Sequence, residues 1–540
     1  MTVDGNIPNT VDEVLQGAVT RFELSPFFKM STVMILNEEG INVHALKLEP
    51  TSVYLDYVIY DQPINRGEES FRYVEGLTQL LNSYISTLGS RRKRQAPEGS
   101  SNSTEEYGKI FDKVLRAYFI ETNISKILEN TTSVSDLLYT TLSYTYSNLK
   151  EVYPSIPWDA ATGISRDVPV LLVNPDYFHA LDNLWSNLDE EDMKLFVFMN
   201  VLVKRVLPYT TLSLRSLLSD IGAKGDMVYT DIDCVEHSLN LANEEIHAIY
   251  IGQFTQKVLR NRLKLTDIKN KVSDAFQKYL SASTWIQPDL DRAVSALARN
   301  IKMHFSPLKS TVQQTMNVSG QSFLSLAIEL HRQKHAFEIN RLGSKATEIT
   351  MDWTSAKVYF DAHFNAIGFP SGLTIYLTEG EPPFDIYGYI GMMMTEEFIK
   401  VLTGPLTGGI PPLWWGTTNT LAFNDVRQCF SSQLPTFQNK FYDIGNVMIL
   451  NGAFQVIDQV YLTDSINTDR VIEGTSITEN VIFILNVAQL HCQLNDGSYR
   501  QRLTRERINN VMMNNVNFKR MFSCPDPSPL VSDNTCSLFL

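Results

Sequence analysis

Apolar residues recur at helical spacing through the first two thirds of the chain. One stripe consists of Val235, Leu239, Ala242, Ile246 and Ile249, and a second, which begins after Pro288, consists of Leu290, Val294, Leu297 and Ile301. Side chains three or four positions apart lie on one face of a helix. We therefore predict two helices that bury these faces in a core, with Pro288 in the first turn of the second one.

Charges predict a third helix and a loop. An acidic cluster at residues 189–191 follows Ser186, and the segment ends in Lys204 and Arg205, an order of charges that suits the helix dipole. Residues 90–104 are polar and rich in Ser, Gly and Pro, which predicts an exposed loop. The basic run at 91–94 suits a subtilisin-like processing enzyme, a nuclear-import receptor or simply a solvated loop.

The pattern changes at about Trp353, where apolar runs become shorter and turns rich in Gly and Pro appear at 368–370 and 380–383. This change indicates a mixed α+β region after a mainly helical one. We predict a mostly α, α+β protein with a helical domain over residues 1–340 and a second domain over residues 341–540. A chain of 540 residues is also too long for one ordinary core.

Composition excludes several classes of protein. The net charge of -14 argues against nucleic-acid binding, which needs a basic face. No apolar run reaches the length of a membrane span, and the residues after Met1 lack the basic and apolar regions of a signal peptide. The five cysteines form no CxxC pair, so a structural zinc site is not expected. An odd number of cysteines in a large protein is as consistent with buried free thiols as with disulfides.

Short sequence blocks after residue 360 resemble, in the same order, the catalytic domain of the neprilysin family of zinc metallopeptidases. The blocks are Asn365–Gly372 (NAIGFPSG), Glu381–Phe384 (EPPF), Tyr387–Met392 (YGYIGM), Trp414–Trp415, Val426–Cys429 (VRQC), Val487–Cys492 (VAQLHC), Phe518–Cys524 (FKRMFSC) and Cys536–Phe539 (CSLF). The helical half resembles the family more loosely, around Cys234 and Trp285. The resemblance implies a large helical domain followed by a zincin-like, thermolysin-like domain.

The resemblance locates the family's zinc helix. The family's H-E-x-x-H motif falls on residues 396–400, where the two histidine positions hold Glu396 and Lys400 and the general-base position keeps Glu397. The third ligand, a glutamate in the family, falls on Ile449. Because an ammonium repels a dication, the resemblance implies that no metal binds here. We also expect Glu396 and Lys400 to form an i,i+4 ion pair, with Ile449 filling space near them.

The family's substrate-binding positions have changed as well. The strand that grips a peptide backbone falls on residues 357–360, where Lys357 and Val358 replace the family's Asn and Ala. The histidine that stabilises the transition state falls on Gln501, whereas a partner arginine survives as Arg507. Of the catalytic residues, only Glu397 and Arg507 remain as remnants.

These substitutions imply a neprilysin-like pseudo-peptidase, which is not an enzyme, needs no cofactor and acts by binding a peptide or protein partner. The alternative is an active zinc metalloendopeptidase that cleaves peptides, in which case zinc is the cofactor. A further alternative is a chain that does not fold stably, because the front of the family's helical domain is missing. The beginning of this sequence resembles a point inside the family's first helical part, and we expect an incomplete or recently shortened gene product.

The resemblance also implies a cell-surface or extracellular protein. Cys429 and Cys536 are a disulfide pair in the family, whereas Cys234, Cys492 and Cys524 correspond to cysteines that bond to the missing front and are expected to lack partners. Disulfides persist in oxidising compartments. The candidate glycosylation sites are Asn102, Asn123, Asn130 and Asn317.

A second histidine pair offers another candidate metal site. His331 and His335 lie four positions apart with Glu329 nearby, but no glutamate follows the first histidine. The neighbouring Arg332 and Lys334 favour a solvated helix face. The remaining histidines, His491 among them, are scattered and are interpreted as ordinary.

Overall fold

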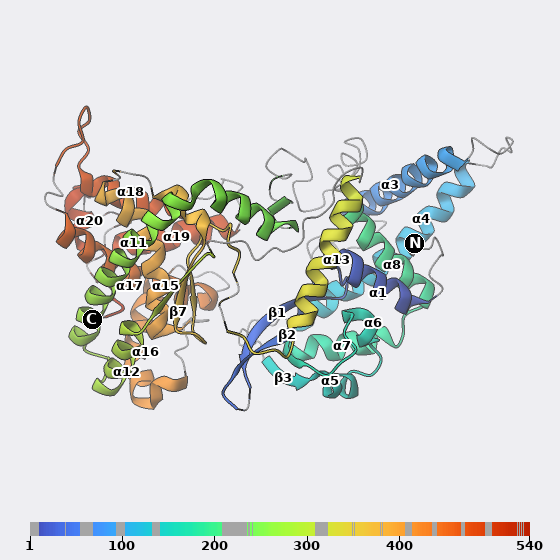
Figure 1. Cartoon of the computed structure of the whole chain (residues 1–540), viewed down its shortest axis with the longest axis horizontal. Coiled ribbons are helices and arrows are strands. Elements are labelled where there is room, and N and C mark those ends of the chain that lie inside the picture. Colours follow the sequence, from blue (N-terminus) through green and yellow to red (C-terminus); the bar gives the residue numbers. More distant parts are fainter. Residues whose placement is uncertain are drawn as a thin grey trace. The chain divides into compact units, whose positions relative to one another are not determined.

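The computed structural model describes residues 10–37, 39–53, 68–92, 103–131, 141–207, 235, 238–239, 241–307, 322–347, 349, 351–377, 380, 382–404, 413–434, 440–465, 470–491, 499–525, 528, 530, 532 and 534–539. The chain forms two compact units (Figure 1). Unit 1 consists of Met1–Ala242 and Thr315–Thr347, and unit 2 of Asn243–Gln314 and Glu348–Leu540. No helix in the described part of the chain is both long and apolar enough to span a membrane.

The units interleave along the sequence, which differs from the single boundary expected near residue 340. The reason lies in packing. Phe276 on α11 (Asn243–Ala282) and Leu290 and Val294 on α12 (Pro288–Arg299) are buried in the same core as residues of the second half of the chain. The later helix α13 (Phe323–Arg341) instead packs against α1 (Val11–Phe22) at the beginning of the chain. Helical periodicity predicts a buried face but not the core that receives it.

Unit 1 contains a four-stranded sheet and helices that cover it. Its elements are α1 (Val11–Phe22), β1 (Phe28–Leu36), β2 (Asn42–Pro50), α3 (Glu68–Arg92), α4 (Ser103–Thr131), β3 (Thr141–Thr145), α5 (Tyr146–Val152), α6 (Trp158–Thr162), β4 (Pro169–Val173), α7 (Pro175–Trp185), α8 (Glu190–Val201), η2 (Leu202–Val206) and α13 (Phe323–Arg341). The strand order is β1-β2-β4-β3, with β2 and β4 parallel and the outer pairs antiparallel.

Local signals explain where the helices of unit 1 begin. The predicted third helix starts one residue after Asp189, whose side chain accepts hydrogen bonds from the N–H groups of Glu191 and Asp192. Asp189 therefore caps this helix, and Ser186 lies in the preceding turn. Helix α3 ends at Arg92 and helix α4 begins at Ser103, so the predicted loop is shorter than expected. Residues 93–102 lie outside the described part.

Unit 2 is mainly helical around a three-stranded sheet. Its elements are α11 (Asn243–Ala282), α12 (Pro288–Arg299), β5 (Lys302–Phe305), β6 (Tyr359–Asp361), β7 (Ala366–Phe369), η4 (Ser371–Tyr376), α14 (Pro383–Ile386), η5 (Tyr387–Gly391), α15 (Met392–Thr403), η7 (Leu413–Trp415), α16 (Gly416–Gln433), α17 (Lys440–Asp464), α18 (Glu479–Leu490), α19 (Tyr499–Met513) and α20 (Val516–Met521). The strand order is β5-β7-β6, so β6 is an edge strand. The predicted mostly α fold class is confirmed.

The two apolar stripes behave differently. Helix α12 begins at Pro288 as predicted and buries Leu290 and Val294, although Leu297 is exposed. The earlier stripe is wrong as a core face, because Val235 and Ile249 are exposed. Helix α11 starts only at Asn243, so this stripe crosses a helix boundary and does not form one continuous face.

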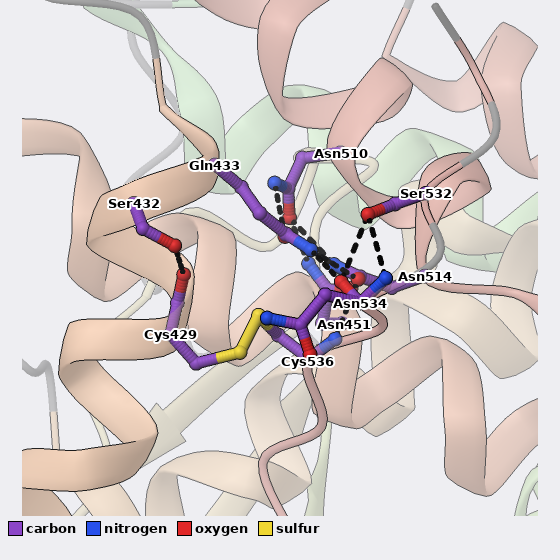
Figure 2. The surroundings of a disulfide bond; sticks show 9 residues. All are labelled: Cys429, Ser432, Gln433, Asn451, Asn510, Asn514, Ser532, Asn534 and Cys536. Carbon is purple, nitrogen blue, oxygen red and sulfur yellow. Dashed lines mark hydrogen bonds between the residues drawn. A yellow bond between two sulfur atoms is a disulfide. The ribbon is translucent and has the colours of Figure 1, made fainter. Parts of the chain in front are cut away.

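A disulfide joins Cys429 on α16 to Cys536 in the C-terminal tail, the pairing that the resemblance implies (Figure 2). Their Cα atoms are 5.8 Å apart. Cys524 is free and partly exposed, whereas Cys234 and Cys492 lie outside the described residues. The disulfide attaches the tail to the helical core of unit 2.

Carboxamide side chains, most of them buried, hold the tail beside this disulfide. The Cys536 N–H donates to Asn514 Oδ1 over 2.7 Å, and the Gln433 side chain donates to the Asn534 carbonyl over 2.9 Å (Figure 2). Asn451 and Asn510 extend the network into α17 and α19. Buried amides stabilise a fold only when their partners are present, so the network fixes one position of the tail.

Candidate functional site

The segment before α15 allows close helix packing. It is a short π-helix, η5, which contains Gly388 and Gly391. A Cβ atom at Gly388 would lie 2.6 Å from Asn486 Cβ on α18, and one at Gly391 would lie 2.9 Å from a methyl of Ile457 on α17. The glycines of the YGYIGM block therefore let two helices approach closely and thereby set the position of α15.

Helix α15 has a buried face and a polar face. Phe398, Ile399 and Leu402 are fully buried in the core of unit 2. Glu396, Glu397 and Lys400 are only partly buried, so their charged groups lie on the face that the core does not cover. This is the helix on which the resemblance places the zinc motif.

Glu397 connects α15 to the edge strand β6. Its Oε2 accepts a hydrogen bond from the Phe360 N–H over 2.9 Å, and its Oε1 accepts one from Lys400 Nζ. Glu396 Oε1 lies instead 3.2 Å from His491 Nε2. This distance is within ion-pair range, but the two atoms lack hydrogen-bond geometry. The predicted Glu396–Lys400 pair is therefore wrong.

The partners differ because both i,i+3 and i,i+4 neighbours are within reach on a helix. The β6 backbone holds the Glu397 carboxylate next to Lys400, and residue 491, at the end of α18, lies beside Glu396. His491 was interpreted as ordinary, because a contact across 95 positions leaves no local signal in the sequence.

The other predicted site residues lie as follows. Ile449 is 5% exposed on α17, within the core of unit 2. On the segment before β6, Lys357 is exposed and Val358 is buried. Gln501 and Arg507 lie on α19, and the Gln501 side chain is outside the described residues.

The residues at this position do not fit a zinc ion. A zinc site needs three protein ligands with N, O or S donors. Here Ile449 offers only hydrocarbon, and the Lys400 ammonium is positively charged and bonded to Glu397. Within the described residues, no group of three or more His, Cys, Asp or Glu side chains is arranged to hold a metal. No step of a reaction is therefore assigned to zinc.

The second histidine pair is buried, contrary to the predicted solvated face. His331 and His335 on α13 are 6% and 8% exposed. His331 Nδ1 lies 3.3 Å from Glu23 Oε2, and Lys334 Nζ lies 3.1 Å from Glu23 Oε1. Burial lowers the pKa of both histidines. Burial alone raises the pKa of Glu23, but His331 and Lys334 bring it below its usual value.

Acidification is expected to destabilise unit 1 between about pH 7 and pH 5. The unfolded chain protonates histidines near pH 6.5, whereas the folded chain keeps His331 and His335 neutral to lower pH. Stability is therefore present above about pH 6.5 and is lost as the pH falls towards the folded-state pKa values. The lowered pKa of Glu23 adds a further loss in stronger acid.

Thermal melts over this pH range measure the effect. A His331→Gln/His335→Gln variant should lose less stability on acidification than the wild type, and replacing the exposed His179 with Gln serves as the control. An equal pH dependence in the wild type and the double variant would contradict the assignment to these two histidines.

Of the four predicted glycosylation sites, Asn123 and Asn130 are exposed on α4. Asn102 and Asn317 lie outside the described residues. The glycosylation hypothesis therefore remains a prediction for all four.

Comparisons with known proteins agree with the resemblance. Residues 13–306 match the sequence model described as "Peptidase family M13". Endothelin-converting enzyme 1 from Cavia porcellus is 22% identical over 204 residues, which are 34% of this chain and 27% of that protein. The human enzyme is also 22% identical over 204 residues, which are 34% of this chain and 26% of that protein. The chain thus matches about a quarter of the length of these curated relatives.

Two solved structures share the fold. The zinc metalloprotease Zmp1 of Mycobacterium tuberculosis, solved with an inhibitor, has a TM-score of 0.76 and 15% identity, and the match covers 98% of this chain and 83% of that one. PepO from Lactobacillus rhamnosis HN001 has a TM-score of 0.71 and 14% identity, with 98% and 85% covered. At these identities the likeness concerns the fold alone.

The expectation that the protein is not an enzyme needs correction. It was inferred from the residues at 396, 400 and 449, yet the family that matches more than half of the chain is a family of peptidases. The lack of a zinc arrangement among the described residues does not establish inactivity. The match over residues 13–306 and the shared fold lead to one conclusion: the chain belongs to peptidase family M13.

Proposed function

We propose that the protein is an endopeptidase that binds peptides in extended form and cleaves them. The observation that carries this proposal is the match of residues 13–306 to a peptidase family. Zinc is the metal of the similar Mycobacterium tuberculosis enzyme, and it is the cofactor to test first. Because the residues at the α15 position do not fit zinc, the proposal requires that any zinc ligands lie elsewhere in the chain.

The edge of the sheet in unit 2 is the proposed peptide-binding surface. Strand β6 pairs with β7 on one side, and its other edge faces α15. An extended peptide can add to such an edge through backbone hydrogen bonds. The Phe360 N–H, one donor of β6, is bonded to Glu397. A peptide that takes this donor must displace Glu397 Oε2 from the Phe360 N–H, and this oxygen can then accept a proton as a general base while Oε1 stays bonded to Lys400.

Replacing Glu397 with Ala tests this role. Cleavage is expected to fall by at least about a hundredfold, a typical contribution of a general base. Peptide binding should become tighter in the same variant, because the Phe360 N–H is then open to the peptide. The exposed Glu473, replaced with Ala, is the matched control and should change neither quantity.

The assay uses the purified chain, loaded with zinc and dialysed, with a mixture of unlabelled peptides. Mass spectrometry detects the products, and elemental analysis of the same sample measures zinc. Peptides that remain intact with the wild-type chain would contradict the proposal, and intact peptides that still bind would identify a binding protein. Stoichiometric zinc would show that ligands exist outside positions 396, 400 and 449.

We also propose that the protein acts at the cell surface or in the extracellular space. The Cys429–Cys536 disulfide supports an oxidising compartment. Asn123 and Asn130, which are exposed, provide the test. Mapping of glycopeptides on protein from its native source should find a glycan on at least one of them, and unmodified Asn at both, together with a reduced disulfide, would contradict this location.

A further inference from the structure

A small cavity in unit 2 lies between α11 and the ends of β5 and β7, and none of the residues that line it belongs to α15. Arg262 and Asn261 of α11 line it, together with Ser306 after β5 and Ser371 and Leu373 of η4. The centre of a water molecule can occupy a volume of about 10 Å³ in this cavity. The cavity therefore has room for one water molecule or one small ion. The cavity is thus too small for a peptide or a nucleotide.

Arg262 carries a positive charge into this cavity. One of its terminal nitrogens donates to the Ser306 carbonyl, and the guanidinium carbon lies 5.1 Å from the centre of the Phe305 ring. In the described part of the chain, no carboxylate lies within 4.0 Å of the guanidinium, and Nε has no hydrogen-bond partner. Burial lowers the pKa of Arg262, as expected for a cation that is desolvated without a neighbouring acid.

Ser306 supplies a second donor. Its side chain is 1% exposed, and Oγ has no partner among the described residues. Buried hydroxyls and guanidinium N–H groups are almost always satisfied in native proteins, because an unpaired one is costly. Among the described residues, two unsatisfied donors and a guanidinium without a carboxylate partner meet at this cavity, which indicates a missing acceptor that carries negative charge.

A neighbouring histidine and serine do not change this assignment. Ser371 Oγ lies 2.9 Å from His247 Nε2, but these residues are only 3% and 5% exposed. A serine nucleophile needs access for its substrate, and this cavity has none for a peptide. Burial lowers the pKa of His247, which favours its neutral form, and His247 does not line the cavity, whereas Arg262 does.

We propose that this cavity binds one small monovalent anion, chloride under physiological conditions, between Arg262 Nε and Ser306 Oγ. Both atoms donate hydrogen bonds, and the anion offsets the positive charge of the partly buried Arg262. A neutral water molecule would satisfy the donors but would leave the charge uncompensated. The anion would stabilise the contact of α11 with the sheet, and this site is independent of the proposed peptidase activity.

The test is a titration of chloride into the full chain in a buffer whose only other anion is gluconate, at constant ionic strength. The melting temperature of unit 2 is expected to rise with chloride and to saturate. Ser306→Ala should weaken the apparent chloride affinity at least about tenfold, and Arg262→Met should abolish the response. Arg292→Met, which replaces an exposed arginine whose guanidinium likewise donates to a backbone carbonyl, is the matched control and should respond as the wild type.

Crystals soaked in bromide provide the direct measurement. The expected result is one anomalous peak within hydrogen-bonding distance of Arg262 Nε and Ser306 Oγ. A melting temperature independent of chloride, or an equal response in Ser306→Ala and the wild type, would overturn the proposal. If Arg262→Met does not fold, the Ser306→Ala titration and the bromide peak still decide between an anion and a water molecule.

Discussion

Replacing Cys536 with Ser is expected to lower the free energy of unfolding of unit 2 by about 4–5 kcal/mol. The disulfide closes a loop with a sequence separation of 107 residues. Cross-linking a loop of this length removes much conformational entropy from the unfolded chain. In a unit of this size, such a loss corresponds to a decrease in melting temperature on the order of 10 °C.

The packing of the tail adds to the effect. Cys536 is 2% exposed and its N–H donates to Asn514, while the Leu538 carbonyl accepts a hydrogen bond from Trp285 over 2.7 Å. Without the disulfide, these contacts alone must hold the tail. The loss of the cross-link therefore also weakens the buried amide network around it.

Calorimetry of the oxidised proteins measures this prediction. Cys524→Ser is the matched control, because Cys524 is free and only partly buried. The free energy of unfolding of this variant should stay within about 1 kcal/mol of the wild-type value. Equal melting temperatures for Cys536→Ser and the wild type would show that the tail contacts, and not the cross-link, hold this end of the chain.

A triple variant, Glu396→His/Lys400→His/Ile449→Glu, is expected to bind about one more zinc ion per chain than the wild type. Two imidazoles four positions apart on α15 reach one metal, and a carboxylate on α17 is a suitable third ligand. Helices α15 and α17 pack against each other in unit 2. The change also removes the Lys400 ammonium, which repels a dication.

The stability of this variant should depend on zinc. Ile449 is 5% exposed, so a glutamate there places a carboxylate in the core, at a cost of several kcal/mol unless a cation compensates it. Chelation is expected to lower the melting temperature of the triple variant but not that of Ile449→Glu alone, which lacks the histidines. Elemental analysis and melts with and without a chelator measure both effects, and equal zinc contents in the triple variant and the wild type would refute the assignment of these ligand positions.

Part of the site could be predicted from the sequence. The order of the blocks around Tyr387–Met392 identified α15, and the resemblance implied the cysteines that pair across 107 positions. The sequence also showed that Glu396, Lys400 and Ile449 stand where the family has ligands. It did not determine activity, because an inference from three positions gave no information about the rest of the chain.

The partners of the charged residues were decided only by the tertiary structure. Lys400 and Glu396 satisfy the local rule for an ion pair, yet β6 holds Glu397 beside Lys400, and His491 lies beside Glu396. Likewise, the burial of His331 depends on α1, which lies far away in the sequence.

The amino-acid sequence by itself determined the start of α12 at Pro288 and the family pattern, and the resemblance carried by that pattern implied the cysteine pair of the tail. The tertiary structure alone decided which helices share a core, which charges meet, and where Arg262 and Ser306 come together at one cavity. The physical reason is the range of the interactions. Periodicity and capping act within a few positions of the chain, whereas burial and ion pairing depend on segments that only packing brings together.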